Sequence, residues 1–171
     1  MVSFPTETVY GLGANALNAE ACNLIFTTKG RPLTDPLIVH VHSLDHGLSL
    51  IDQSDEKVVQ LFKTLAAKFW PGPLTMVVKA NMTVIPSLVT ADTGFVGIRM
   101  PNHKIALDLI RTSGLPLAAP SANKFGHVSP SKADHVYSDF HKDSEVYIID
   151  GGACSFGIES TVLKITFNQE T

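Results

Sequence analysis

Apolar side chains recur at helical spacing in one long segment in the first half of the chain. They are Val58, Leu61, Phe62, Leu65, Ala66 and Phe69, at positions i, i+3, i+4, i+7, i+8 and i+11. This spacing places all of them on one face of a helix. Ser54 precedes the run as a candidate N-cap, and Pro71-Gly72-Pro73 ends it sharply. The pattern predicts an amphipathic helix that packs one face on a core.

Shorter apolar runs predict strands, with further helices between some of them. The predicted strands are residues 2–4, 37–41, 74–78, 95–98, 117–119, 146–149 and 161–165. The other predicted helices run from the cap Asn18 to about Lys29, from Ser43 to about Leu50, from Asn102 through Arg111, and from about Ser131 to Phe140. Several strands follow one another directly, so the alternation is not a clean βαβ repeat. The sequence therefore predicts an α/β fold, a twisted mixed β-sheet with helices packed on it, as a single domain over residues 1–171.

Composition and charge narrow the classes of function. With 44% hydrophobic and 17% charged residues, the chain has the composition of a globular domain. The formal net charge of −3 lacks the basic excess typical of nucleic-acid-binding domains. No apolar run approaches the ~20 residues of a membrane span, and the N-terminus lacks the layout of a signal peptide. Cys22 and Cys154 lie far apart, as is typical of a reduced intracellular protein.

These features predict a cytoplasmic protein without a membrane partner, with a mitochondrial location as the alternative. Both ends of the chain lie beside strand-like segments. Residues 1–3 already resemble a strand, and residues 166–171 trail off after one. The domain is therefore expected to be truncated at both ends.

Candidate chemistry begins in a glycine-containing segment near the N-terminus. Residues 11–16 match the loose dinucleotide pattern G-x-G-x-x-A. That pattern requires a strand before the glycines and a helix directly on them. Here a polar turn, residues 5–8, precedes the glycines, and the helix cap Asn18 comes later. The match does not favour a nicotinamide or flavin site.

A basic pair follows at the predicted end of the first helix. Lys29 and Arg31 flank Gly30. One interpretation is a solvated helix C-terminus, where cations complement the helix dipole. The other is a paired phosphate clamp, stiffened by Pro32 and Pro36, in which Lys supplies a point charge and Arg a planar fork.

Polar residues also mark the ends of predicted strands. Ser121 and Asn123 follow strand 117–119 and suit either ligand binding at a sheet edge or an ordinary turn. Arg99 ends an apolar strand, so it needs a carboxylate, water or a ligand. His40 interrupts strand 37–41, where a lone histidine is more often a core residue.

No motif for covalent or metal-based catalysis accompanies these residues. The histidines lack metal-ligand spacing, so no metal-binding residues are predicted. There is no GxSxG or Cys-His arrangement either. A pocket rich in cations and hydroxyls, without a nucleophile, favours phosphoryl or nucleotidyl transfer.

Several longer motifs carry a resemblance to a known family. They are PTETVYGLGA, KGRP, PLIVHV, FWPGPLT, GIRMP, APSAN and IDGG followed by GIESTV. In this order they resemble the YrdC-like family of threonylcarbamoyl-AMP synthases, over nearly the whole chain. The PGPLT and PSAN forms resemble the type with an extra C-terminal domain. That domain, and a later segment ending in Arg-Pro-Gly, have no counterpart in these 171 residues.

The resemblance implies an activity and a set of partners. The family joins L-threonine, bicarbonate (or CO2) and ATP, with Mg²⁺, into threonylcarbamoyl-AMP and pyrophosphate. A downstream threonylcarbamoyl-transferase complex then modifies adenosine 37 of tRNA to t6A, so the contact with tRNA is indirect.

The resemblance also implies roles for individual residues. Thr8, His40, Arg99, Ala119 and Ser160 would hold threonine, with Arg99 on its carboxylate. Lys29, Arg31, Ser121, Asn123 and Ser129 would hold ATP, and Lys29 and Arg31 would also be catalytic. Asp35 departs from the Asn common in this family, and an acid near phosphates would repel them.

Three other hypotheses stay open from the sequence. An RNA-binding module would need a basic surface. A carbamoyltransferase that uses carbamoyl phosphate, as in hydrogenase-maturation proteins, would carry attached acylphosphatase and zinc-finger segments. The third is an inactive ATP-binding fragment of the family.

Overall fold

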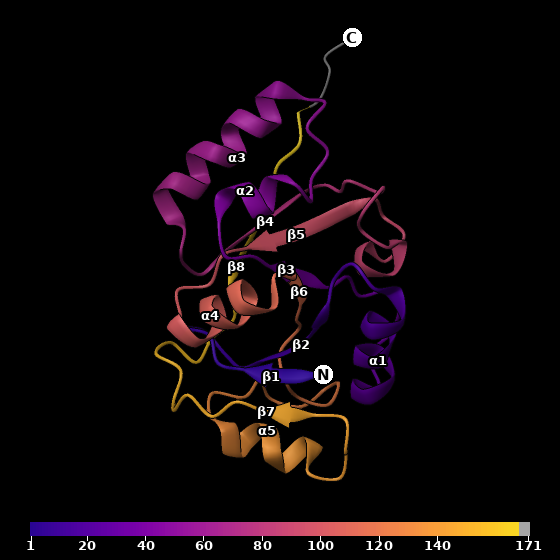
Figure 1. Ribbon diagram of the computed structural model, residues 1–171, viewed down its shortest axis with the longest axis vertical. Helices are drawn as coiled ribbons and strands as arrows, with labels where there is room; N and C mark the ends of the chain where they lie inside the picture. The colour runs from indigo at the N-terminus through magenta and orange to yellow at the C-terminus, as the bar shows by residue number, and fades with distance from the viewer. Residues whose placement is uncertain (168–171) are drawn as a thin grey trace.

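Eight strands form one mixed sheet in the computed structural model, which describes residues 1–167 (Figure 1). The strands are β1 (Val2–Phe4), β2 (Gly11–Asn15), β3 (Ile38–His40), β4 (Leu74–Lys79), β5 (Phe95–Arg99), β6 (Leu117–Ala118), β7 (Tyr147–Ile148) and β8 (Thr161–Lys164). Their order across the sheet is β7-β1-β2-β6-β3-β5-β4-β8. Residues 168–171, part of the segment 166–171 expected to trail off after the last strand, lie outside the described residues.

The sheet contains both parallel and antiparallel pairs of strands. The pairs β1–β7, β3–β5 and β4–β8 are parallel, and the other neighbours are antiparallel. The helices are α1 (Ala19–Lys29), α2 (Leu44–Leu48), α3 (Glu56–Phe69), α4 (Lys104–Ser113) and α5 (Ala133–Phe140), with a short 3-10 helix at Ser87–Thr90. Figure 1 shows α2 and α3 toward one end of the molecule and α5 beside β7 toward the other. The predicted mixed α/β fold is confirmed.

Local capping signals fix the ends of α1 as predicted. The Asn18 side chain accepts a hydrogen bond from the Ala21 backbone N–H, and Gly30 closes the helix in the left-handed conformation with φ 67°. The predicted start of α3 is one residue early. Asp55 is the cap, because Ser54 instead donates its backbone N–H to the Asp52 side chain in a turn.

Two other predicted helix starts are also early. Helix α4 follows His103 rather than Asn102, and α5 begins at Ala133 rather than near Ser131. Neither helix has a side-chain hydrogen bond at its cap. The sequence therefore offered no specific signal for these two boundaries.

Strand β2 is the strand that the sequence did not predict. Its glycines pair with β1, with Phe4 opposite Gly11 and Val2 opposite Gly13. A β-carbon at Gly13 would lie 2.7 Å from Cε1 of the Phe4 ring, which is fully buried. The glycines thus make room for an aromatic ring in a strand, rather than forming a phosphate-binding turn.

We predict that Gly13→Ala destabilises the protein, because the added methyl group meets a buried ring that cannot move aside. Overpacking of this kind costs about 1–3 kcal/mol of unfolding free energy. Urea unfolding measures it. Gly47→Ala is the matched control: it lies in α2, where a β-carbon would meet Ile98 Cγ2 at an ordinary 3.4 Å. Equal unfolding free energies for the two variants would contradict this packing account.

Candidate ligand-binding pocket

Two parallel strands end side by side at the centre of the sheet. In the β3–β5 pair, His40 lies opposite Arg99. Strand β6 runs antiparallel to β3, and the Ala119 backbone N–H donates to the Ile38 carbonyl at 2.9 Å. The sheet therefore brings these residues to one edge although they are far apart in sequence, as open α/β sheets commonly do at ligand sites.

The polar turn of residues 5–8 closes over this edge. Thr6 Oγ1 donates to the Val9 carbonyl at 2.7 Å and accepts from the backbone N–H groups of Thr8 and Val9 at 3.2 Å each. The backbone of Phe156 donates to the Glu7 carbonyl, and that of Gly157 to the Thr8 carbonyl, both at 2.9 Å. The turn thus holds the loop that carries Glu159 and Ser160.

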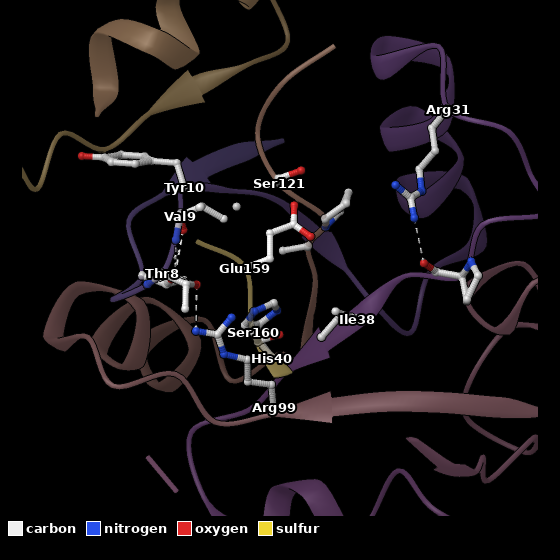
Figure 2. Close-up of a pocket in the computed structure, with 15 residues that line it drawn as sticks. Thr8, Val9, Tyr10, Arg31, Ile38, His40, Arg99, Ser121, Glu159 and Ser160 are labelled. Carbon is white, nitrogen blue, oxygen red and sulfur yellow. Dashed lines mark hydrogen bonds between the residues drawn. The ribbon is translucent and has the colours of Figure 1, made fainter. Parts of the chain in front are cut away.

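These segments enclose a pocket of about 110 Å³ (Figure 2). Its lining is formed by Thr6, Thr8, Val9, Tyr10, Gly11, Arg31, Pro36, Ile38, His40, Arg99, Ala119, Pro120, Ser121, Glu159 and Ser160. All five residues expected to hold threonine are among them. Of those expected to hold ATP, Arg31 and Ser121 line the pocket.

Arg99 is a buried cation in the pocket wall. Its side chain is about 5% exposed and its NH2 lies 2.8 Å from Glu7 Oε2, a carboxylate that is 6% exposed. The same NH2 donates to Thr8 Oγ1 at 3.0 Å. Sequence reasoning missed Glu7. The available signal was an acid between two threonines in an otherwise apolar stretch, where an ion pair satisfies both charges.

His40 is a neutral imidazole beside this cation. Burial, and after it the charge of Arg99, lower the pKa of His40 to about 3. Its ring packs edge-on against Phe4, with the ring centroids 6.0 Å apart. His40 can therefore offer the pocket a hydrogen bond but not a positive charge at neutral pH.

Arg31 lies at another side of the pocket, held by the loop that follows it. Its Nε donates to the Asp35 carbonyl at 3.3 Å. Its NH2 donates to the Pro36 carbonyl at 3.1 Å, the dashed line at Arg31 in Figure 2. The Asp35 carboxylate is 3.9 Å from the same NH2 and does not line the pocket. Asp35 thus pairs with Arg31 from outside the cavity.

Lys29 does not line the pocket. It is 3% exposed, and its Nζ donates to the Ser121 carbonyl at 2.5 Å and to the Asn123 carbonyl. Burial, and after it the charge of Arg31, lower the pKa of Lys29 to about 8. A second lysine makes the reciprocal contact: from the loop, Lys124 Nζ donates to the Thr28 carbonyl of α1 at 2.6 Å. Two lysines thus tie the end of α1 to the loop that carries Ser121.

Asn123 and Ser129 use their side chains elsewhere in the structure. The Asn123 amide donates to the carbonyls of Lys124 and His127 at 2.9 and 2.8 Å. Ser129 Oγ donates to Glu159 Oε1 at 2.8 Å. Neither Asn123 nor Ser129 lines the pocket. Glu159, a second acid that the sequence analysis missed, points into the middle of the cavity (Figure 2).

Within residues 1–167, no group of three or more His, Cys, Asp or Glu side chains is arranged to hold a metal ion. In the same residues, none of the helices has the length and apolar character that crossing a lipid bilayer requires.

A mixed α/β domain that gathers two arginines, several hydroxyls and a neutral imidazole in one small pocket has the lining typical of sites for small anionic or zwitterionic ligands. The family model for Sua5, YciO and YrdC proteins, described as "Telomere recombination", matches residues 1–171. The chain belongs to this family.

Individual relatives agree with that assignment. The threonylcarbamoyl-AMP synthase of Bacillus subtilis (strain 168) is 49% identical over 165 residues, which are 96% of this chain and 46% of the relative. That of Pseudoalteromonas atlantica is 34% identical, over 87% of this chain and 77% of the relative. The crystal structure of Pyrococcus abyssi Sua5 complexed with L-threonine has a TM-score of 0.89 and 48% identity, over 96% of this chain and 46% of that chain. The chain spans about half the length of the first and third of these relatives.

We predict that acid destabilises the protein through His40. The folded protein holds His40 at a pKa of about 3, below the ordinary 6.5. Below pH 6.5 the unfolded chain therefore takes up a proton that the folded one refuses, and stability is lost as pH falls. The loss is up to about 1.4 kcal/mol per pH unit.

Urea unfolding at pH 7.5, 6.5 and 5.5 tests this linkage. His40→Gln cannot titrate, so its unfolding free energy should fall less with acid than that of the wild type. His141→Gln, at an exposed histidine, is the matched control and should retain the wild-type slope. A His40→Gln slope equal to that of the wild type would refute the linkage.

Proposed function

We propose that the chain carries the activity of an L-threonylcarbamoyl-AMP synthase, a nucleotidyltransferase that joins L-threonine, bicarbonate or CO2, and ATP with release of pyrophosphate. The observation that carries the proposal is the buried Arg99, which lines a pocket together with Thr8 and His40. The relatives that bear this enzyme's name, and the threonine complex of one of them, support it.

In this proposal the threonine lies at the Arg99 end of the pocket. The guanidinium binds the carboxylate in a charge-assisted contact. Thr8, the neutral His40, the Ala119 backbone and Ser160 supply hydrogen bonds around the rest of the amino acid. Because His40 is uncharged, it does not compete with Arg99 for the carboxylate.

The nucleotide lies toward Arg31 and Ser121. Arg31 carries the charge that faces the phosphates, and Ser121 adds a hydrogen bond. Lys29 holds the loop of Ser121 in place by donating to its carbonyls. Its positive charge, just behind that loop, also favours the phosphates. Asn123 shapes the same loop, and Ser129 becomes available to the nucleotide once it leaves Glu159.

Mg²⁺ accompanies the nucleotide in this account and supplies charge neutralisation at the phosphates. It usually binds through one or two carboxylates plus substrate phosphates rather than in a cage made by protein alone. Glu159 is the carboxylate among the described residues that line the pocket, so it is the candidate protein ligand.

The reaction needs these cations because both reactants are anions. A carbamate formed on the threonine amine attacks the α-phosphorus of ATP, and pyrophosphate leaves. Two unit charges about 4 Å apart repel by about 4 kcal/mol at an effective dielectric near 20. Arg31 and Arg99, preorganised by their own hydrogen bonds, offset this repulsion.

The product is a small activated adenylate, which a threonylcarbamoyl-transferase complex consumes to form t6A at position 37 of tRNA. Handing over a small molecule does not require this chain to bind tRNA. The net charge of −3 agrees with an indirect role in tRNA modification.

Pyrophosphate release from this chain, measured with threonine, bicarbonate and ATP omitted in turn, tests the proposal. Release that requires all three substrates is expected. Release without threonine would indicate another nucleotide reaction, and no release despite ATP binding would favour an inactive ATP-binding fragment. A gel shift with tRNA at physiological salt would support an RNA-binding module instead.

We predict that Arg99→Ala weakens threonine binding at least tenfold, because one charge-assisted hydrogen bond contributes about 1.5–3 kcal/mol. Calorimetry with L-threonine measures the dissociation constant. Arg111→Ala is the matched control, since Arg111 is an exposed residue of α4 paired with Asp108. Unchanged threonine affinity in Arg99→Ala would remove Arg99 from the threonine site.

We predict that Lys29→Ala and Arg31→Ala each lower pyrophosphate release at least tenfold. Arg31→Ala removes a charge-assisted contact with the phosphates, and Lys29→Ala removes the charge-assisted hydrogen bonds that hold the loop of Ser121. Threonine affinity should stay near that of the wild type in both, since neither side chain contacts Arg99, Thr8 or His40 in the hydrogen bonds of the described residues. Circular dichroism checks the fold. Near-wild-type release from either variant would exclude that residue from the reaction.

A further inference from the structure

The buried ion pair of Glu7 and Arg99 assigns a role to a residue outside the pocket lining. Arg99 and Thr8 line the pocket, whereas Glu7 lies behind them. Glu7 Oε2 is 2.8 Å from Arg99 NH2, and both side chains are nearly inaccessible to solvent. The Glu7 carboxylate therefore contacts the Arg99 guanidinium from the side that faces away from the pocket.

Hydrogen bonds of the main chain fix the turn that carries this carboxylate. Glu7 lies in the turn that Thr6 closes with three hydrogen bonds, and its carbonyl accepts from the Phe156 backbone N–H at 2.9 Å. Residues 3–14 are all buried, so the turn has no freedom to move into solvent. Glu7 is thus a fixed anchor rather than a mobile surface acid.

Glu7 contacts one nitrogen of the planar Arg99 guanidinium. Arg99 NH2 donates to Thr8 Oγ1 and forms a short ion pair with Glu7 Oε2. Within residues 1–167, Arg99 Nε and both carboxylate oxygens of Glu7 have no hydrogen-bond partner, so charge attraction alone joins Glu7 to the guanidinium. A guanidinium offers five N–H donors in a rigid plane, so fixing one nitrogen sets the direction of the others. Without Glu7, the guanidinium would carry an unpaired buried charge and could turn toward Glu159, the acid that lines the pocket.

We propose that Glu7 is a positioning residue, which holds the Arg99 guanidinium in the orientation that receives the ligand's carboxylate. The inference rests on the proposed function, in which Arg99 binds the carboxylate of threonine. It deepens that function by adding a residue that does not touch the substrate. Preorganising a binding group in this way raises affinity because less order is lost on binding.

Calorimetry with L-threonine and with L-threonine amide, which lacks the carboxylate, tests the role of Glu7. Glu7→Gln keeps the shape of the side chain and removes its charge. We expect its threonine dissociation constant to rise at least tenfold, which is about 1.4 kcal/mol. Its affinity for the amide should match that of the wild type, because Arg99 has no carboxylate to receive. Glu20→Gln, at an exposed acid in the first turn of α1, is the matched control.

A merely structural role predicts a different result. It would lower thermal stability but change the affinities for both ligands equally in the folded protein. Combining Glu7→Gln with Arg99→Ala should add no further loss of threonine affinity to that of Arg99→Ala, because Glu7 acts only through Arg99. An additional loss in the double variant would overturn the proposal.

A second variant protects the test against misfolding. Glu7→Asp keeps the charge but withdraws it by one methylene, so its threonine affinity should lie between those of the wild type and Glu7→Gln. Wild-type or tighter affinity in every folded Glu7 variant would overturn the positioning role while leaving the proposed function intact. Failure of the wild type itself to bind threonine would overturn both.

Discussion

A buried positive charge at the end of a central strand is the constraint on which this structure depends. Arg99 ends β5 in the pocket wall, where bulk water cannot solvate it, so the protein must supply its counter-charge. Glu7 provides it from a turn near the N-terminus, 2.8 Å away. Removing one partner from such a pair costs about 3–5 kcal/mol, so the ion pair links β5 firmly to the turn.

The rest of the pocket follows from how the chain returns to this point. The parallel pairing of β3 and β5 places His40 beside Arg99, and β6 brings Ala119 and Ser121 to the same edge. The turn that carries Glu7 also binds the loop before β8, which delivers Glu159 and Ser160. One end of the cavity is thus organised around a compensated cation, and Arg31, held by the 31–36 loop, forms another side.

The sequence could predict those features that depend on neighbours along the chain. Helix α1 was predicted correctly because Asn18 caps it and Gly30 ends it, and both signals are local. Strand β2 was missed because its glycines are required by the packing of Phe4, which lies on another strand. The resemblance to the family named seven residues that line the pocket, which local patterns alone would not have grouped. They are Thr8, Arg31, His40, Arg99, Ala119, Ser121 and Ser160.

The same limit explains what the sequence could not supply at the site. Nothing near Glu7 in the sequence identifies Arg99 as its partner, because 92 positions separate them. Lys29 looked like a free phosphate ligand, but its ammonium lies on carbonyls of residues 121 and 123. Glu159 is held in the cavity by backbone contacts of its loop with residues 7 and 8 and by a hydrogen bond from Ser129 Oγ. Such pairings arise from the tertiary fold, so a local pattern can mark a residue as unusual but cannot identify its partner.

A crystal structure of this chain with bound L-threonine tests the central claim most directly. The account predicts the threonine carboxylate within hydrogen-bonding distance of the Arg99 guanidinium, with the Glu7–Arg99 pair still formed behind it. Threonine bound elsewhere, or an Arg99 side chain turned away from Glu7 to reach it, would contradict the account.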